Sequence, residues 1–183
     1  QFRFEHFELP TADTIKGARD IGAWVSMQSN FGVEDYVYQD RLGGRARLLC
    51  PHQDVVNEGV PMMLGSDGMP TSMLYVVWAA MHHPNPDQRL DAVSALTAAS
   101  AAAGAYEGSS RGTLQPGAKT DIVIASPKLL QMLQDGKLAE DYFRDAARPA
   151  GERSTPIRSK VEQLESAVTR VFRNGQLVYD ATH

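Results

Sequence analysis

The chain has 183 residues, of which 43% are hydrophobic and 22% charged, as is ordinary for a soluble globular protein with a real core. Its formal net charge of −4 gives no broad basic surface, so we expect no nucleic-acid partner. The single cysteine, Cys50, excludes an intrachain disulfide and is compatible with a reducing compartment, so we expect a cytoplasmic location.

No apolar stretch is long enough to span a bilayer, and the N-terminus has no signal-peptide pattern, so we expect no membrane partner. The chain lacks an initiator Met and starts in a predicted strand, from which we expect it to begin inside a longer protein.

The first hundred residues alternate between predicted strands and helices. We expect helices at 11–20, 48–57, 72–82 and 91–103, and a long polar loop at 32–47, of the kind that is often functional. The predicted strands are 2–9, 23–27 and 60–64. This alternation implies parallel strands joined by right-handed crossovers.

The pattern changes after Gly104. We expect a strand at 120–125, a helix at 129–142, a loop at 147–157 and a helical turn or two at 160–165. A hairpin follows, with strands 168–172 and 177–179 around Asn174-Gly175, a pair that suits a type I′ turn. Because these strands lie outside the strand–helix alternation, we expect residues 111–125 and 168–180 to pair in a small second sheet.

The apolar run Val60–Leu64 ends abruptly at Gly65-Ser66-Asp67-Gly68. A buried parallel strand has this pattern, and ligands of α/β folds bind just beyond the carboxyl ends of such strands. Asp67 is therefore a candidate catalytic carboxylate. Ser-Asp-Gly is also ordinary turn chemistry, and this reading stays open.

The tips of the other two strands are also polar, with His6 after the first and Gln28 or Asn30 after the second. With one strand between them, His6 and Asp67 would have Cα atoms roughly 10 Å apart. Imidazole and carboxylate suit Zn²⁺, but a metal site needs three or four ligands. We interpret His82-His83 as a solvated helix end, His52 as a residue of a helix start or of the surface, and Cys50 as a small core residue.

Six segments stand out in order along the chain: Arg3-Phe-Glu-His6, Val25-Ser-Met-Gln28, Leu64-Gly-Ser-Asp67, Gly112-Thr-Leu-Gln-Pro-Gly117, Thr120-Asp-Ile-Val-Ile124 and Val171-Phe-Arg-Asn-Gly-Gln-Leu-Val-Tyr179. Together they resemble the C-terminal half of the amidohydrolase superfamily, most closely its YtcJ-like, amidohydrolase-3-type metal-dependent hydrolases. They span nearly the whole chain, although Ala118 and Thr120 depart from the family's usual Lys and Ala, and 127–166 is longer and less familiar.

The resemblance implies an α/β fold: strands six to eight of a (β/α)₈ TIM barrel in residues 1–110, and part of a β-sandwich in 111–183, with a helical and loop insertion at 127–166. It implies that His6 and Asp67 bind a divalent metal, most simply Zn²⁺, and that Asp67 takes a proton from the attacking water. The expected substrate-binding residues are Gln28, Asn30, Ser66 and Met69.

The implied activity is hydrolysis of a C–N bond, amide or cyclic amide, in a small-molecule substrate. The family's His-x-His motif and its other ligands are absent from this sequence, so we expect the rest of the barrel on the same or another chain, and an oligomer. Two alternatives are a catalytically silent fragment with an assembly role, and an α/β protein that binds a ligand without metal. The lack of a Gly-rich phosphate loop argues against nucleotides.

Overall fold

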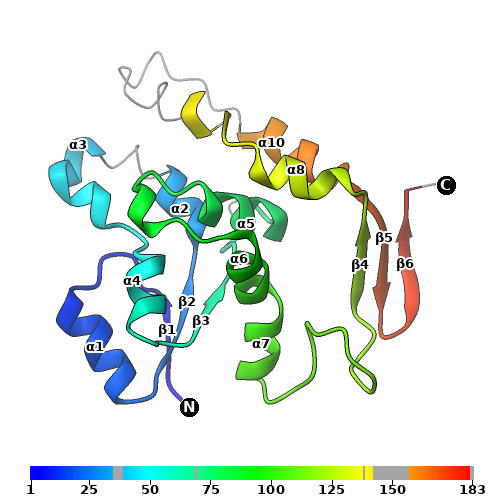
Figure 1. Ribbon diagram of the computed structural model, residues 1–183, viewed down its shortest axis with the longest axis horizontal. Coiled ribbons are helices and arrows are strands. Elements are labelled where there is room, and N and C mark those ends of the chain that lie inside the picture. The colour runs from blue at the N-terminus through cyan, green and yellow to red at the C-terminus, as the bar shows by residue number, and fades with distance from the viewer. Residues whose placement is uncertain (35–38, 69, 138, 142–156, 182–183) are drawn as a thin grey trace.

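The computed structural model describes residues 1–34, 39–68, 70–137, 139–141 and 157–181 (Figure 1). In these residues the strands form two separate three-stranded sheets, the first ordered β1-β2-β3 and the second β4-β5-β6. The elements of the first part are β1 (Arg3–His6), α1 (Ala12–Asp20), β2 (Trp24–Met27), α2 (Ser29–Glu34), α3 (Gln39–Leu42), the 3₁₀-helix η2 (Gly43–Leu48), α4 (His52–Asn57), β3 (Met62–Leu64), α5 (Met73–Met81), the 3₁₀-helix η3 (Pro86–Gln88), α6 (Ala92–Ala99) and α7 (Ala101–Tyr106).

The first sheet is parallel, and β2 is its central strand. Val25, Ser26 and Met27 of β2 are all buried, and because successive side chains point to opposite faces, the strand is covered on both faces. The pairing places His6, Met27 and Leu64 side by side, so the carboxyl ends of the three strands reach the same edge. The sheet is open within the described residues, because β1 and β3 each have only β2 as a neighbour.

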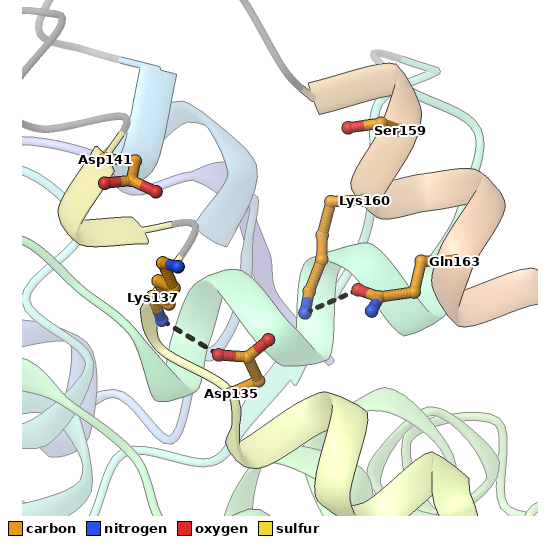
Figure 2. A pocket seen from close by; sticks show the side chains of 6 residues that line it. All are labelled: Asp135, Lys137, Asp141, Ser159, Lys160 and Gln163. Atoms are coloured by element: carbon orange, nitrogen blue, oxygen red, sulfur yellow. Dashed lines mark hydrogen bonds between the residues drawn. The ribbon is translucent and has the colours of Figure 1, made fainter.

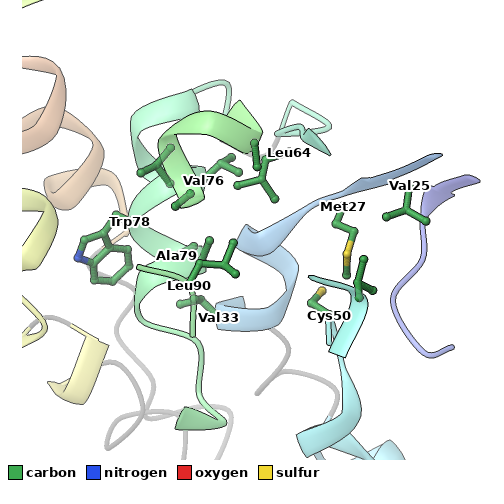
Figure 3. Packing of buried hydrophobic residues seen from close by; sticks show 14 of the residues in the cluster. Val25, Met27, Val33, Cys50, Leu64, Val76, Trp78, Ala79 and Leu90 are labelled. Atoms are coloured by element: carbon green, nitrogen blue, oxygen red, sulfur yellow. The ribbon is translucent and has the colours of Figure 1, made fainter. Parts of the chain in front are cut away.

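Helix α5 forms the centre of the core together with β2. It begins at the Ser72 cap, whose side chain accepts from the Tyr75 amide, and residues 75–80 are all buried. A helix that is apolar on all sides must be covered on all sides. It contacts α2, α6, α8 and α10, and Figure 3 shows Val76, Trp78 and Ala79 packed with Val33 and Leu90.

Several predicted boundaries of the first part were wrong. The stretch predicted as a loop at 32–47 contains the end of α2, then α3 and η2. The helix predicted from Leu48 begins only at His52, and the helix predicted at 91–103 breaks at Ser100 into α6 and α7. At Ser100 the backbone has φ −134° and ψ −80°, which is not helical. The Ala-rich sequence on both sides favours a continuous helix, so the break was not predicted.

The second part contains β4 (Ile122–Ala125), α8 (Lys128–Gln134), α10 (Ile157–Glu165), β5 (Val168–Arg173) and β6 (Gln176–Asp180). The three strands pair antiparallel, which confirms the predicted separate sheet. Asn174 and Gly175 have φ angles of 49° and 77°, as a type I′ turn requires. Helix α8 ends before the predicted 142, α10 begins three residues before the predicted 160, and the predicted loop at 147–157 lies outside the described residues apart from Ile157.

Helices α8 and α10 lie against α5, and the second sheet stands beside this layer (Figure 1). None of the helices in the described part is long and apolar enough to cross a membrane.

Candidate functional site

The candidate site lies where the three parallel strands end. His6 and Phe7 have φ angles of 68° and 50°, and Asp67 has 49°, so the chain turns in the left-handed region directly after β1 and after β3. Non-glycine residues rarely adopt this conformation, and it concentrates at functional sites. The ends of β1 and β3, but not that of β2, thus carry this uncommon backbone conformation.

The His6 side chain is accessible to a ligand. It is 47% exposed, its Nδ1 atom lies 3.6 Å from the Glu8 carboxylate, and its ring centroid is 6.0 Å from that of Phe31 in α2. The imidazole therefore stands at the surface of the strand edge with a carboxylate beside it.

Asp67 is exposed, and it lies in a turn held by a hydrogen bond between its two neighbours. The Gly68 amide donates to Ser66 Oγ at 3.3 Å, and Gly68 has φ 74°. The turn reading of Ser66-Asp67-Gly68 is therefore correct for the backbone, and it leaves the Asp67 carboxylate on the surface beyond β3. A turn and a reactive site are compatible here.

Gln28 and Asn30 lie against the segment Gly65-Ser66 that follows β3. The buried Asn30 amide donates to the Ser66 carbonyl at 3.2 Å, and the buried Gln28 amide donates to Ser26 Oγ at 3.5 Å. Gln28 also lies against Gly65, where a Cβ atom would come within 3.3 Å of its Nε2. Gln28 and Asn30 were predicted to bind substrate, but these contacts are made with other residues of the protein. Met69, predicted with them, lies outside the described residues.

Residues 1–34, 39–68, 70–137, 139–141 and 157–181 contain no group of three or more His, Cys, Asp or Glu side chains that could hold a metal ion. His6 and Asp67 supply the right kinds of donor atom for a borderline cation, but two ligands do not fill a coordination shell. The donor set fits a metal in kind and falls short in number.

A buried histidine pair behind the tip of β2 corrects the interpretation of His83 as solvated. His52 is the first residue of α4, as predicted for a helix start, but it is buried and does not lie on the surface. Both histidines are buried, and their ring centroids lie 5.5 Å apart. His52 Nε2 lies 2.9 Å from Ser29 Oγ, and His83 Nε2 lies 2.9 Å from the Leu49 carbonyl. Cys50, as predicted, is a buried core residue.

His82, predicted as solvated with His83, is half-buried, and its Nε2 lies 2.8 Å from the Leu133 carbonyl. Burial lowers the pKa of all three histidines; for His52 it does so to about 3, with a further contribution from His83. The His52 imidazole is therefore neutral at physiological pH. No local sequence pattern marks the Ser29–His52 contact, because 23 residues separate the partners.

A hollow of about 370 Å³ lies away from the strand tips, between the segment after α8 and α10 (Figure 2). It is lined by Asp135, Lys137, Asp141, Ser159, Lys160 and Gln163. Lys160 is buried beside it: its Nζ donates to the Met132 carbonyl and to Gln163, and lies 5.2 Å from the Trp78 ring centroid. Burial lowers the pKa of Lys160, and Asp135 opposes this. The bond to Met132 fastens α10 to α8, and the contact with Trp78 joins it to α5.

The chain is similar in structure to several solved proteins. An uncharacterized metal-dependent hydrolase from Pyrococcus furiosus aligns with TM-score 0.58 and 20% identity over 63% of this chain. Guanine deaminase from C. acetobutylicum with bound guanine aligns with TM-score 0.59 and 16% identity over 97%. A mutant of atrazine chlorohydrolase from Arthrobacter aurescens TC1, complexed with zinc and atraton, aligns with TM-score 0.59 and 17% identity over 97%.

This chain spans 26%, 39% and 36% of those three proteins, respectively. At these identities the likeness is one of fold. No curated protein matches the sequence. The sequence matches the model described as "Amidohydrolase family" over residues 1–179, nearly the whole length. The chain therefore belongs to the amidohydrolase family.

Proposed function

We propose that this chain is the C-terminal part of a metal-dependent hydrolase that cleaves a C–N bond, amide or cyclic amide, in a small molecule. The observation that carries the proposal is the pair of accessible donors, His6 and Asp67, in left-handed turns at the aligned carboxyl ends of β1 and β3. Ligands of barrels and open α/β sheets bind at this edge. Membership of the amidohydrolase family and the deaminase neighbour support the reaction class.

In this proposal β1, β2 and β3 are strands six to eight of a (β/α)₈ barrel in residues 1–110. The second sheet is part of a β-sandwich in 111–183, and α8 and α10 belong to the insertion at 127–166. The remaining barrel strands come from another segment or chain. The fraction of each solved relative that this chain covers supports such a division.

His6 and Asp67 would hold the metal through an imidazole nitrogen and a carboxylate oxygen. A bound divalent cation, for which we propose Zn²⁺, supplies positive charge that polarises the substrate and lowers the pKa of water. The Asp67 carboxylate accepts the proton of the attacking water as general base. It is exposed beyond β3, where a water molecule can reach it. Gln28, Ser66 and Met69 border the substrate.

The test is Asp67→Asn in the complete barrel, because the amide keeps the shape of the side chain and cannot take the proton. We expect turnover to fall by about 10²–10⁴-fold, the usual contribution of a general base. Asp13→Asn in the first turn of α1 is the matched control and should leave turnover unchanged. Metal content is measured in each protein. Wild-type turnover of a metal-loaded Asp67→Asn protein would exclude Asp67 as the base.

The lack of a three-ligand group in the described residues favours a second candidate for the chain alone, a catalytically silent role in assembly. We therefore propose that the isolated chain is inactive and associates through its open sheet edges, since unpaired edge strands favour pairing. Sedimentation with metal analysis checks this. A monomer that holds one tightly bound metal ion per chain would contradict it.

A further inference from the structure

Asn30 lies behind the Asp67 turn. Its side chain has no exposed surface, and its Nδ2 atom donates to the Ser66 carbonyl at 3.2 Å. Ser66 directly precedes Asp67, so the bond fixes the peptide unit from which the Asp67 backbone leaves. A buried side-chain amide that is used in this way holds a backbone and is turned away from bulk solvent.

The other described bonds of the turn are local or lie on the strand. The Gly68 amide donates to Ser66 Oγ at 3.3 Å, and the Gly65 amide donates to the Met27 carbonyl at 3.0 Å, which continues the pairing of β2 with β3. These bonds shape the turn and end the strand. The Asn30 bond connects the turn to a different element, α2, and so restrains its direction relative to the neighbouring strand tip.

Helix α2 is itself firmly held. Ser29, the residue before Asn30, lies 2.9 Å from Nε2 of the buried His52, and Val33 has no exposed surface in the core against α5. The lowered pKa of His52 keeps its imidazole neutral at physiological pH, so this contact does not change over that range. The restraint on Ser66 thus starts from a rigid part of the core.

We infer that Asn30 is a positioning residue, which sets the direction of the Asp67 carboxylate by holding the Ser66 carbonyl from helix α2. This replaces direct substrate contact as the role of Asn30. The catalytic consequence rests on the proposed function of Asp67, whereas the restraint on the turn does not.

The test compares Asn30→Ala with Asn85→Ala in the complete barrel. Asn85 is the matched control, because its Nδ2 also donates to a backbone carbonyl, that of Arg47, at 3.3 Å, away from the Asp67 turn. The first readout is amide hydrogen exchange at residues 66–68 in metal-free protein. A lost hydrogen bond is worth about 1 kcal/mol, so exchange should rise about fivefold in Asn30→Ala and stay unchanged in Asn85→Ala.

The second readout is kinetic. We expect Asn30→Ala to lower kcat about tenfold with little change in KM, because a misdirected base slows the chemical step without removing a substrate contact. If Asn30→Ala does not fold, Ser29→Ala is used in its place. It removes the contact between Ser29 and His52 that holds α2, and should raise amide exchange at 66–68 by a smaller factor.

Unchanged exchange at 66–68 in the folded variant would overturn the inference, and so would a rise in KM at constant kcat, which marks a substrate contact. The two proposals can fail separately. Raised exchange in a protein without hydrolytic activity would leave the positioning role and refute the proposed function. Loss of turnover in Asp67→Asn with unchanged exchange in Asn30→Ala would support the proposed function and refute the positioning role of Asn30.

Discussion

The central strand of the first sheet and the strands of the second use the same kinds of residue in opposite environments. Val25 in β2 has no exposed surface, whereas Val178 in β6 is 57% exposed and Val123 in β4 is 59% exposed. Strands β2 and β3 of the first sheet share a buried core with α5 (Figure 3), whereas every residue of β1 is exposed. The second sheet leaves many apolar side chains on its surface, among them Val123, Ile124, Leu177, Val178 and Tyr179. Stability and the candidate site therefore belong to the first sheet.

The largest expected difference comes from truncating one side chain in each sheet. Met27→Ala should cost about 2–5 kcal/mol of unfolding free energy, because it removes a fully buried side chain and leaves a cavity. Leu177→Ala should cost within about 0.5 kcal/mol, since Leu177 is half-exposed. Urea denaturation of both variants measures this. Equal losses would show that the second sheet is as well covered as the first.

The junction between the two regions offers a smaller effect. A Cβ atom on Gly104 of α7 would lie 2.1 Å from the Arg111 carbonyl oxygen, on the segment leading to the second sheet. Gly104→Ala should cost about 1–3 kcal/mol by overpacking. The control is Gly17→Ala in α1, where a Cβ atom would have no neighbour within 4 Å. Alanine there should raise the free energy of unfolding by about 0.5–1 kcal/mol. If both variants were stabilised, α7 would not be closely packed on that segment.

Acid should loosen the first region through its histidines. Burial lowers the folded-state pKa of His52 from its ordinary value of 6.5 to about 3, so its contribution to stability is complete above pH 6.5 and is lost as the pH falls toward 3. Each such group lowers the unfolding free energy by about 1.4 kcal/mol per pH unit in that window. The pKa values of His82 and His83 are also lowered, so they act in the same direction.

His52→Gln should therefore make the fall in stability below pH 6.5 shallower, by up to about 1.4 kcal/mol per pH unit. Denaturant titrations between pH 7.5 and 4.5 measure the two slopes. Identical slopes for the variant and the wild-type chain would mean that His52 takes up its proton in the folded state.

Much of the first sheet could be predicted from sequence. The apolar runs 23–27 and 60–64 gave β2 and β3, and their polar ends gave the strand tips with Gln28 and Asp67. The Asn174-Gly175 turn gave the hairpin, because a type I′ turn restricts which residues it accepts. These features depend on a few neighbouring residues, so a local pattern is sufficient to find them.

The features that escaped prediction depend on contacts between distant segments. His52 stands at the predicted helix start, yet it is buried against Ser29 and His83. Lys160 has a charged side chain, which usually lies at the surface, yet in α10 it is buried with its Nζ over the Trp78 ring. The tie from Asn30 to Ser66 spans 36 residues. The periodicity of a sequence indicates which face of an element is apolar, but it does not indicate which polar residue from a distant segment contacts that element.

The most direct test of the proposed site is anomalous diffraction at the zinc edge from crystals of the complete barrel. We predict a metal peak within about 2.0–2.2 Å of an imidazole nitrogen of His6 and a carboxylate oxygen of Asp67. The remaining ligands would come from outside residues 1–183. A fully occupied metal site elsewhere in the barrel, with His6 and Asp67 both unliganded, would contradict the account.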